Sequence, residues 1–524
     1  MGQKCRLLIA KDGNKVPFLE SDGGEIRFGS LYNGSYAAGR WLQYHIAEEI
    51  ENVVLFGLGD GQILRGLLER IPGSVFVYEP SEALYREMRH TAICKKLQVE
   101  KRVRIFSGKQ SFTELCVALW ELLNENYVDT TAFRIHSGYG ICYPGEIERL
   151  QGQFTEMIQR INSLRPSVKR FIHSMIRNQL ATVANMEGDI PLGRLAKYWN
   201  KEVPVIVISA GPSLEKNLQW LKEVNGRAFL FSVDAALPLL LENDIIPDLV
   251  ACLDANKNMN CFADERSLSI PLLVTTNAPA GLIRNHRAKK IWGSTHAFMN
   301  ALYTRCGIEL PETEVELGVA TLILASLIDL GTRKIIFVGQ DLAYSKDGKS
   351  HISGREEKFI KNKKYETEGY DGGKVFSRAD WTMTREWMEK EIHRAKDREF
   401  INATEGGAKI KGTRQKTLEE VVGELKVQDI SFQEILDDNR VCIRPEEYEK
   451  LKKEFLQGKE DLNKVRKEGY EKTFFETDYK KLPVMNLVTD YMASLEEKPR
   501  KVRFEKAVDY VYNEYDKEIT AWKH

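Results

Sequence analysis

Short polar side chains follow five apolar segments in the middle of this 524-residue sequence. Carboxylates, amides and hydroxyls of this kind bind the hydroxyl and phosphate groups of small ligands. Where parallel strands end at one edge of a sheet, the residues after them meet around one ligand. The spacing therefore predicts a binding site built from several strand ends. The residues are Ser209 to Ser213, Asp234, Asp254 with Asn256, Thr276 with Asn277, and Gln340 with Asp341.

The turn after the first of these segments is Ser-Ala-Gly-Pro-Ser, residues 209–213. Gly211 has no Cβ, so the backbone there can approach a ligand closely, and Pro212 stiffens the turn by fixing φ. Ser213 lies where the N-cap of the next helix belongs, and the first amides of that helix favour an anion. Because the turn lacks the Gly-Lys-Ser/Thr of a P-loop, ATPase or kinase chemistry of that type has no support.

The elements that must position these residues alternate between strand and helix over residues 186–415. This alternation predicts a central α/β domain with a Rossmann-like, mostly parallel sheet. The expected strands are 203–209, 228–232, 249–253, 272–275, 290–292 and 334–338. The expected helices are 214–223, 236–242 and 318–330.

The N-terminal segment, residues 1–185, predicts a second Rossmann-like domain after a strand-rich start over residues 6–28. Gly57, Gly59 and Gly61 form a turn between a strand and a helix, and Glu79 ends the next strand about 20 residues later. That is the layout of a nucleotide-binding βαβ unit. However, Gly61 follows Gly59 by two residues rather than three, and such turns need glycine even where nothing binds. Whether this turn binds a ligand stays open.

The C-terminal segment, residues 416–524, is rich in Lys, Glu, Tyr and Leu, with apolar residues at helical spacing. It predicts a helical domain whose charge runs form a solvated face; docking of a protein partner is the alternative. The predicted fold is thus α/β, with a central Rossmann-like domain between an N-terminal Rossmann-like domain and a C-terminal helical region.

Composition excludes several classes of function. The 76 Lys and Arg residues equal the 76 Asp and Glu residues, which disfavours nucleic acid or an acidic membrane as a partner. Eight cysteines and nine histidines show no metal-ligating spacing, so no metal site is predicted. The sequence has no signal-peptide pattern at its start and no apolar run that spans a bilayer. We expect a cytoplasmic protein.

Five segments of the sequence resemble the motility accessory factor family. They are VIVISAGPSLEKNL, FSVDAALPLLLENDIIPDLVACLDAN, GVATLILASLIDLGTRKIIFVGQDLAYS, DGKSHISG and INATEGGAKIKGT, in one order and spacing. The resemblance covers residues 186–415 well and the flanking segments more loosely. It implies a glycosyltransferase that moves a nonulosonic acid, of the pseudaminic or legionaminic type, from a CMP-sugar to Ser or Thr of flagellin. The transfer would invert the anomeric carbon and support flagellum assembly and motility.

The resemblance also implies roles for individual residues. His351 would be the base, because an imidazole titrates near working pH; a surface loop histidine is the alternative. Tyr344 would steady the leaving phosphate, with packing as the alternative for an aromatic residue after a strand. Asp341, the third expected catalytic residue, would close the pocket. The residues expected to contact the nucleotide or sugar are Gly211, Pro212, Ser213, Asp234, Asp254, Asn256, Asn277, Gly318, Val319 and Gln340. A loop that faces the acceptor or the sugar would contain Asn402, Glu405, Gly406 and Gly407.

The central segment is similar to two further groups. One is a set of bacterial sialyltransferases with CMP-sugar donors, which use no metal. The other comprises the 6-hydroxymethylpterin diphosphokinases, which transfer diphosphate from ATP and need Mg²⁺; Asp234, Asp254 and Asp341 could hold that ion. Those pterin enzymes are short single domains, so the long flanks here favour the glycosyltransferase, while metal dependence stays open. A third hypothesis is a non-catalytic flagellin-binding assembly factor.

Overall fold

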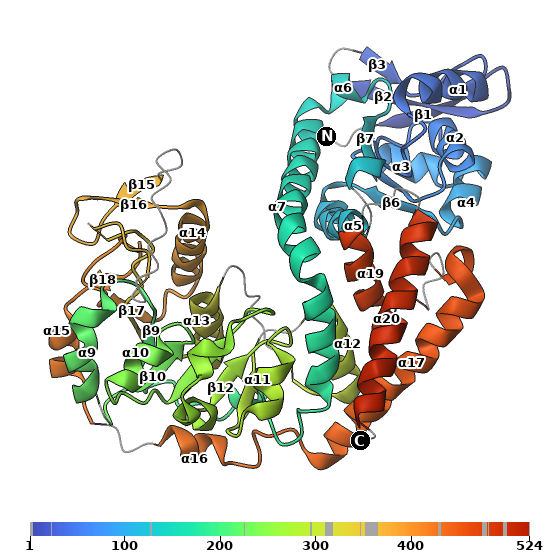
Figure 1. The fold of residues 1–524 in the computed structure, drawn as a ribbon. Coiled ribbons are helices and arrows are strands. Elements are labelled where there is room, and N and C mark those ends of the chain that lie inside the picture. The colour runs from blue at the N-terminus through green and yellow to red at the C-terminus, as the bar shows by residue number, and fades with distance from the viewer. Residues whose placement is uncertain are drawn as a thin grey trace. The chain divides into compact units, whose positions relative to one another are not determined.

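The chain forms two compact units in the computed structural model (Figure 1). Unit 1 contains Met1–Ile172, Lys464–Lys481 and Leu487–Tyr510, and unit 2 contains His173–Asn463, Leu482–Asn486 and Val511–His524. The structure describes residues 4–21, 24–125, 128–224, 226–293, 296–309, 318–345, 347–351, 365–427, 431–473, 479, 481–495 and 500–522. Among these, no helix has both the length and the apolar character that a bilayer span requires.

Unit 1 begins with an antiparallel sheet, as the strand-rich start predicts, and continues into a four-stranded parallel sheet of order β6-β5-β4-β7. Every residue of β4 and β5 is buried, as in a parallel sheet covered on both faces. The first sheet contains β1 (Cys5–Ile9), β2 (Lys15–Ser21) and β3 (Gly24–Arg27). The second contains β4 (Asn52–Phe56), β5 (Val75–Glu79), β6 (Val103–Ser107) and β7 (Thr131–Ile135).

Helices connect the parallel strands of unit 1, so the predicted βαβ unit is β4, α2 and β5. Its helices in the N-terminal part of the chain are α1 (Gly34–His45), α2 (Gln62–Arg70), α3 (Glu82–Met88), α4 (Ala92–Gln98), α5 (Phe112–Glu125) and α6 (Tyr139–Cys142). The long helix α7 (Pro144–Val183) contributes residues to both units.

Unit 2 is built on a nine-stranded sheet of order β18-β17-β14-β9-β10-β11-β12-β13-β8, in which all paired neighbours are parallel. From β9 the chain adds β10 to β13 on one side, and it later places β14 on the other side of β9. The strands are β8 (Ile190–Pro191), β9 (Val205–Ile208), β10 (Phe229–Val233), β11 (Leu249–Cys252), β12 (Leu272–Val274), β13 (Lys290–Trp292), β14 (Lys334–Val338), β17 (Glu399–Asn402) and β18 (Arg414–Gln415).

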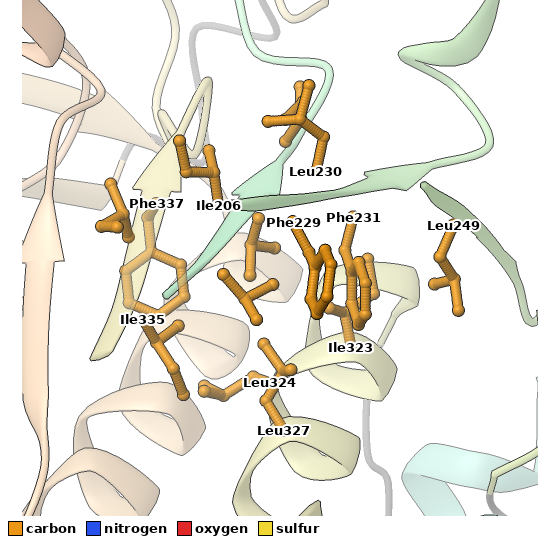
Figure 2. Packing of buried hydrophobic residues seen from close by; sticks show 14 of the residues in the cluster. Ile206, Phe229, Leu230, Phe231, Leu249, Ile323, Leu324, Leu327, Ile335 and Phe337 are labelled. Carbon is orange, nitrogen blue, oxygen red and sulfur yellow. The ribbon is translucent and has the colours of Figure 1, made fainter. Parts of the chain in front are cut away.

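Helix α13 (Val319–Leu330) packs against the centre of this sheet. It is strongly apolar, and Ile323, Leu324 and Leu327 are fully buried. Figure 2 shows Phe229 and Phe231 of β10 pointing toward α13 while Leu230 points to the other face, which is the alternation of a strand. A sheet buried on both faces follows from this packing.

The remaining elements of unit 2 surround the sheet. They are α8 (Leu192–Leu195), α9 (Leu214–Glu223), α10 (Leu237–Glu242), α11 (Ala280–Asn285), α12 (Ala297–Cys306), the hairpin β15 (Tyr365–Glu368) and β16 (Lys374–Ser377), and α14 (Ala379–Arg394). The C-terminal segment is helical, as predicted. It contains α15 (Leu418–Glu424), α16 (Phe432–Leu436), α17 (Pro445–Thr473), α19 (Val484–Ser494) and α20 (Arg500–Trp522).

The predicted fold class is confirmed. All six predicted strands of the central segment form within two residues of their expected ends, and the three predicted helices form as well. The structure adds strands that the sequence analysis does not expect, namely β8, β17, β18 and the β15–β16 hairpin.

Candidate functional site

The carboxyl ends of β9, β10 and β14 surround a cavity of about 250 Å³. The strands β9 and β14 are neighbours, but the chain continues from β9 to β10 on one side and from β14 to β17 on the other. Ligands of open α/β sheets bind at such a switch point. The cavity is lined by residues 209–211, 233–235, 318–321 and 339–342, and by Lys257, Ser350, His351, Asp380, Trp381 and Thr384. Five of the expected nucleotide-site residues line it, namely Gly211, Asp234, Gly318, Val319 and Gln340, together with His351 and Asp341.

Gly211 allows the ends of β9 and β14 to approach each other closely. Its amide donates to the carbonyl oxygen of Gly339 over 2.9 Å. A Cβ at Gly211 would overlap both that carbonyl oxygen and the carboxylate of Asp341. Since a backbone oxygen cannot move aside as a side chain can, the turn requires glycine at this position.

Ser213 occupies the N-cap position of α9, but its side chain does not cap the helix. Its hydroxyl instead donates to Oδ2 of Asp341 over 2.7 Å, and its amide lies 3.3 Å from the same oxygen. Burial raises the pKa of Asp341 from 3.8 to about 6, although these two hydrogen bonds act against the shift. A carboxyl group with such a pKa can exchange a proton near neutral pH.

Hydrogen bonds fix both the side chain and the backbone of Gln340, the residue before Asp341. The hydroxyl of Ser209 donates to its side-chain oxygen, and its backbone amide donates to the hydroxyl of Thr404 over 3.1 Å. All three side chains are buried. The polar floor of the cavity is therefore fixed by contacts between β9, β14 and the segment after β17.

Asp234, at the end of β10, forms an ion pair with Lys257 from the loop after β11. Lys257 Nζ lies 2.7 Å from Oδ1 of Asp234, which is 1% exposed. Burial alone would lower the pKa of Lys257, but Asp234 raises it above its ordinary value, so the ammonium stays charged. The thiol of Cys252 is hydrogen-bonded to the same carboxylate, and Oδ2 of Asp234 is buried without an N–H or O–H donor among the described residues.

The N-terminus of α13 also opens onto the cavity. Gly318 is its N-cap with φ of 153°, and the hydroxyl of Thr321 donates to the Gly318 carbonyl over 2.6 Å. The first amides of an α-helix have no partner within the helix, and the helix dipole favours an anion there. Residues 318–321 can therefore contribute backbone donors to a phosphate.

His351 lies at the cavity beside an aromatic ring that the sequence analysis did not single out. Its Nδ1 is 3.2 Å from the hydroxyl oxygen of Ser350, and its ring centroid is 6.0 Å from that of Trp381. Tyr344 also packs against Trp381, with ring centroids 4.9 Å apart, and does not line the cavity. The rest of the expected His351 motif, residues 352–354, lies outside the described residues.

Other expected contact residues do not line the cavity. Asp254 and Asn256 belong to the loop after β11 and do not line the cavity, and Pro212 adjoins the cavity without lining it. Asn277 is engaged inside the protein: its side-chain oxygen accepts from Gln179 of α7 over 3.2 Å, and its amide nitrogen contacts the ring of His296. A ligand contact by Asn277 would have to replace these bonds.

The expected acceptor loop packs behind Asp341. Gly407 has φ of 69°, and a Cβ there would overlap the backbone of Asp341, while Gly406 lies against Ser213. The carboxylate of Glu405 accepts from Asn217 over 2.8 Å and from the amide of Leu418 over 2.9 Å. Asn402, the last residue of β17, is buried, and its side-chain oxygen accepts from the Thr404 amide over 3.1 Å. The loop thus supports the cavity wall, and none of its four expected residues lines the cavity.

The three aspartates named for Mg²⁺ do not fit one shared ion. Asp234 is bound by Lys257, Asp341 is bound by Ser213, and Asp254 lies outside the cavity lining. Within the described part of the chain, no three His, Cys, Asp or Glu side chains are grouped as metal ligands.

The glycine turn of unit 1 is filled by side chains of the protein itself. A Cβ at Gly57 would overlap the ring of Tyr139, and one at Gly59 would overlap the ring of His136. Glu79 accepts from the amide of Leu58 over 3.0 Å and from the hydroxyl of Tyr139. Burial raises the pKa of Glu79 to about 7. The groups that would receive a ribose in a nucleotide-binding unit are therefore already hydrogen-bonded.

Comparisons with known proteins agree with this architecture. The family model of 6-hydroxymethylpterin diphosphokinase MptE-like proteins matches residues 177–347. A solved structure of the MAf glycosyltransferase from Magnetospirillum magneticum AMB-1 aligns with a TM-score of 0.59 at 17% identity. That alignment covers 99% of this chain and 89% of the other, so the two share a fold along nearly their whole lengths. No curated protein matches the sequence.

Proposed function

We propose that this chain is a cytoplasmic glycosyltransferase that moves a nonulosonic acid from a CMP-sugar to Ser or Thr of flagellin. The main support is the fold shared with the MAf glycosyltransferase, which extends over 99% of this chain rather than over the sheet domain alone. The cavity at the β9–β14 switch point is the second support, because it combines an anion-favouring helix N-terminus with a buried carboxylate and a histidine.

The proposed reaction needs few groups. The hydroxyl oxygen of the acceptor attacks the anomeric carbon of the sugar while the bond from that carbon to the phosphate oxygen of CMP breaks. His351 takes the proton of the acceptor hydroxyl as the new bond forms. The transition state resembles an oxocarbenium ion, so the carboxylate of Asp341 supports it by charge when ionised. The amides at the start of α13 face the departing phosphate.

Mass spectrometry of flagellin tests the proposed function. Flagellin co-expressed with the wild-type chain and with a confirmed supply of CMP-nonulosonic acid should gain the mass of one or more sugar residues. Flagellin from cells that lack the chain should not. An unmodified flagellin in the presence of both donor and wild-type chain contradicts the proposed function.

The role of His351 is tested in the same assay. His351→Ala should reduce the rate of flagellin modification by about 10²-fold or more, since positioned proton transfer contributes roughly 10²–10⁴ to a rate. Its affinity for CMP should change little. Undiminished transfer by the variant excludes His351 as the base.

The family-model match over residues 177–347 favours one other candidate, a pyrophosphokinase of the 6-hydroxymethylpterin type. That activity would release AMP from ATP in the presence of Mg²⁺ and a pterin alcohol. The poor fit of Asp234, Asp254 and Asp341 to a shared ion weighs against it. Formation of AMP that depends on the pterin would establish this activity in place of the transferase.

A further inference from the structure

We propose that Lys257 binds the phosphate of the nucleotide in the cavity, with Asp234 holding its ammonium group in place. The proposal deepens the proposed function, and rests on it for the statements that the ligand is a nucleotide and that a sugar leaves its phosphate. Lys257 is not among the residues that the strand-end pattern or the family resemblance indicates. It comes from the loop after β11 and reaches the cavity at the end of β10.

The ammonium group of Lys257 is held in one position at the cavity. Lys257 lines the cavity, its side chain is 16% exposed, and its Nζ is fixed 2.7 Å from Oδ1 of Asp234. A lysine held in one place by a buried carboxylate has already lost most of its side-chain freedom. It can therefore bind an anion at a lower entropic cost than a mobile surface lysine.

Lys257 also balances the charge of the cavity wall. Among the described residues that line the cavity, Lys257 is the one Lys or Arg, whereas Asp234, Asp341 and Asp380 all carry carboxylates. Asp380 is already paired with Arg378 at 2.8 Å. The carboxylates that a phosphate at the start of α13 would meet are therefore those of Asp234 and Asp341, and Lys257 is the positive side chain that offsets them. As the sugar leaves, the electron pair of the broken bond stays on a phosphate oxygen, and the ammonium stabilises that charge.

The Lys257–Asp234 pair differs from an ion pair that only supports the fold. Both residues of the pair line the cavity. Oδ2 of Asp234 is buried without an N–H or O–H donor among the described residues, and the Asp234 carboxylate is hydrogen-bonded to the thiol of Cys252. The ion pair of Lys290 and Asp189 in the same sheet differs. Both oxygens of Asp189 accept hydrogen bonds, one from the Lys290 amide and one from the indole of Trp292, and the pair does not line the cavity.

Calorimetric titration of matched nucleosides and nucleotides tests the proposal. Wild-type protein should bind CMP more tightly than cytidine, and this ratio of affinities measures phosphate recognition. In Lys257→Met the ratio should fall about tenfold or more, the loss of one charge-assisted contact, while the affinity for cytidine changes less than about threefold. Lys290→Met, which removes a comparably buried lysine from an Asp pair, should keep the wild-type ratio.

A second variant distinguishes loss of phosphate binding from misfolding. Lys257→Met leaves the buried carboxylate of Asp234 unpaired, so the double variant Lys257→Met with Asp234→Asn removes the pair without a change in net charge. It should also lose the phosphate preference. Asp234→Asn alone should keep a preference for CMP over cytidine, because Lys257 remains, but should bind CMP more weakly, because the ammonium loses the carboxylate that holds it in place.

The outcomes separate this proposal from the proposed function. An unchanged ratio in Lys257→Met, or equal losses for CMP and cytidine, overturns the role of Lys257 in phosphate binding. AMP and adenosine are titrated in parallel. If wild-type protein binds AMP but not CMP, the CMP-sugar assignment fails. The role of Lys257 is then tested by the ratio of the affinities for AMP and adenosine. If wild-type protein binds no nucleotide, both proposals fail.

Discussion

At the scale of single residues, the candidate site depends on how closely two strand ends can approach. Gly211 and Gly339 join β9 to β14 through a backbone hydrogen bond of 2.9 Å, and the carboxylate of Asp341 lies where a Cβ on Gly211 would be. Asp341 in turn holds Ser213 at the start of α9. Because Gly211 has no Cβ, the carboxylate of Asp341 can come close enough to hold the hydroxyl of Ser213 at the start of α9.

This close approach predicts the effect of Gly211→Ala. The added methyl group must displace both Asp341 and the backbone of Gly339, so we expect a loss of about 1–3 kcal/mol in the free energy of unfolding, the usual cost of overpacking. CMP affinity should fall about tenfold or more, because the displaced residues line the cavity. Chemical denaturation and calorimetry measure the two effects.

Gly281→Ala is the matched control for this substitution. Gly281 lies inside α11 at an ordinary φ, and a Cβ added there would meet nothing within 4 Å. Alanine at this position should leave CMP binding unchanged and stabilise the protein by up to about 1 kcal/mol, because alanine has the higher helix propensity. If Gly211→Ala behaves like Gly281→Ala, the close approach does not matter for the site.

At the scale of elements, α6 completes the βαβ unit of unit 1. Tyr139, the first residue of α6, places its hydroxyl between the glycine turn and the end of β5. That hydroxyl donates to Glu79 and accepts from the amide of Gly59 over 3.1 Å. Strand, turn and helix are therefore joined by a buried phenol at the position where a nucleotide-binding unit would hold its ligand.

Tyr139→Phe tests this arrangement. Removing the hydroxyl leaves the buried carboxyl of Glu79 and the Gly59 amide short of a partner, so unit 1 should lose about 1–3 kcal/mol of stability. Amide hydrogen exchange of peptides covering residues 53–61 and 75–79 should show the loss. Tyr36→Phe, at an exposed position of α1, should change stability by no more than about 0.5 kcal/mol. Equal behaviour of the two variants would show that the phenol is not structurally important.

The sequence predicts what is local in this fold and misses what depends on long-range contacts. The strands β9, β10 and β14 are visible as apolar runs, and the polar residues Asp234 and Asp341 are visible because each closely follows its strand. Lys257 escapes prediction because only folding returns its loop to the end of β10. Asn277 has the right position after β12, yet its side chain is bonded to α7, and no local pattern reveals that helix contact.

At the scale of the whole molecule, each unit carries a parallel sheet with a glycine-containing turn after a central strand, but the two turns differ in what faces them. In unit 2 the turn at 209–213 opens onto a cavity with Lys257 and the start of α13. In unit 1 the turn at 57–61 is covered by Tyr139 and His136. The same supersecondary motif thus serves ligand binding in one unit, under the proposed function, and packing in the other.

Hydrogen exchange with and without CMP tests this division. Saturating CMP should slow exchange in peptides covering residues 209–213, 234–237, 318–321 and 339–342, since a bound ligand reduces local opening. Peptides covering residues 57–61 should exchange at the same rate with and without CMP. The Leu58 amide and the Tyr139 hydroxyl already donate to Glu79, and the Gly59 amide already donates to Tyr139. Gly211→Ala at the same CMP concentration provides the control and should show weaker protection, because its affinity for CMP is lower. Protection at residues 57–61 would mean that Tyr139 yields to a nucleotide, and that the packing role of this turn is wrong.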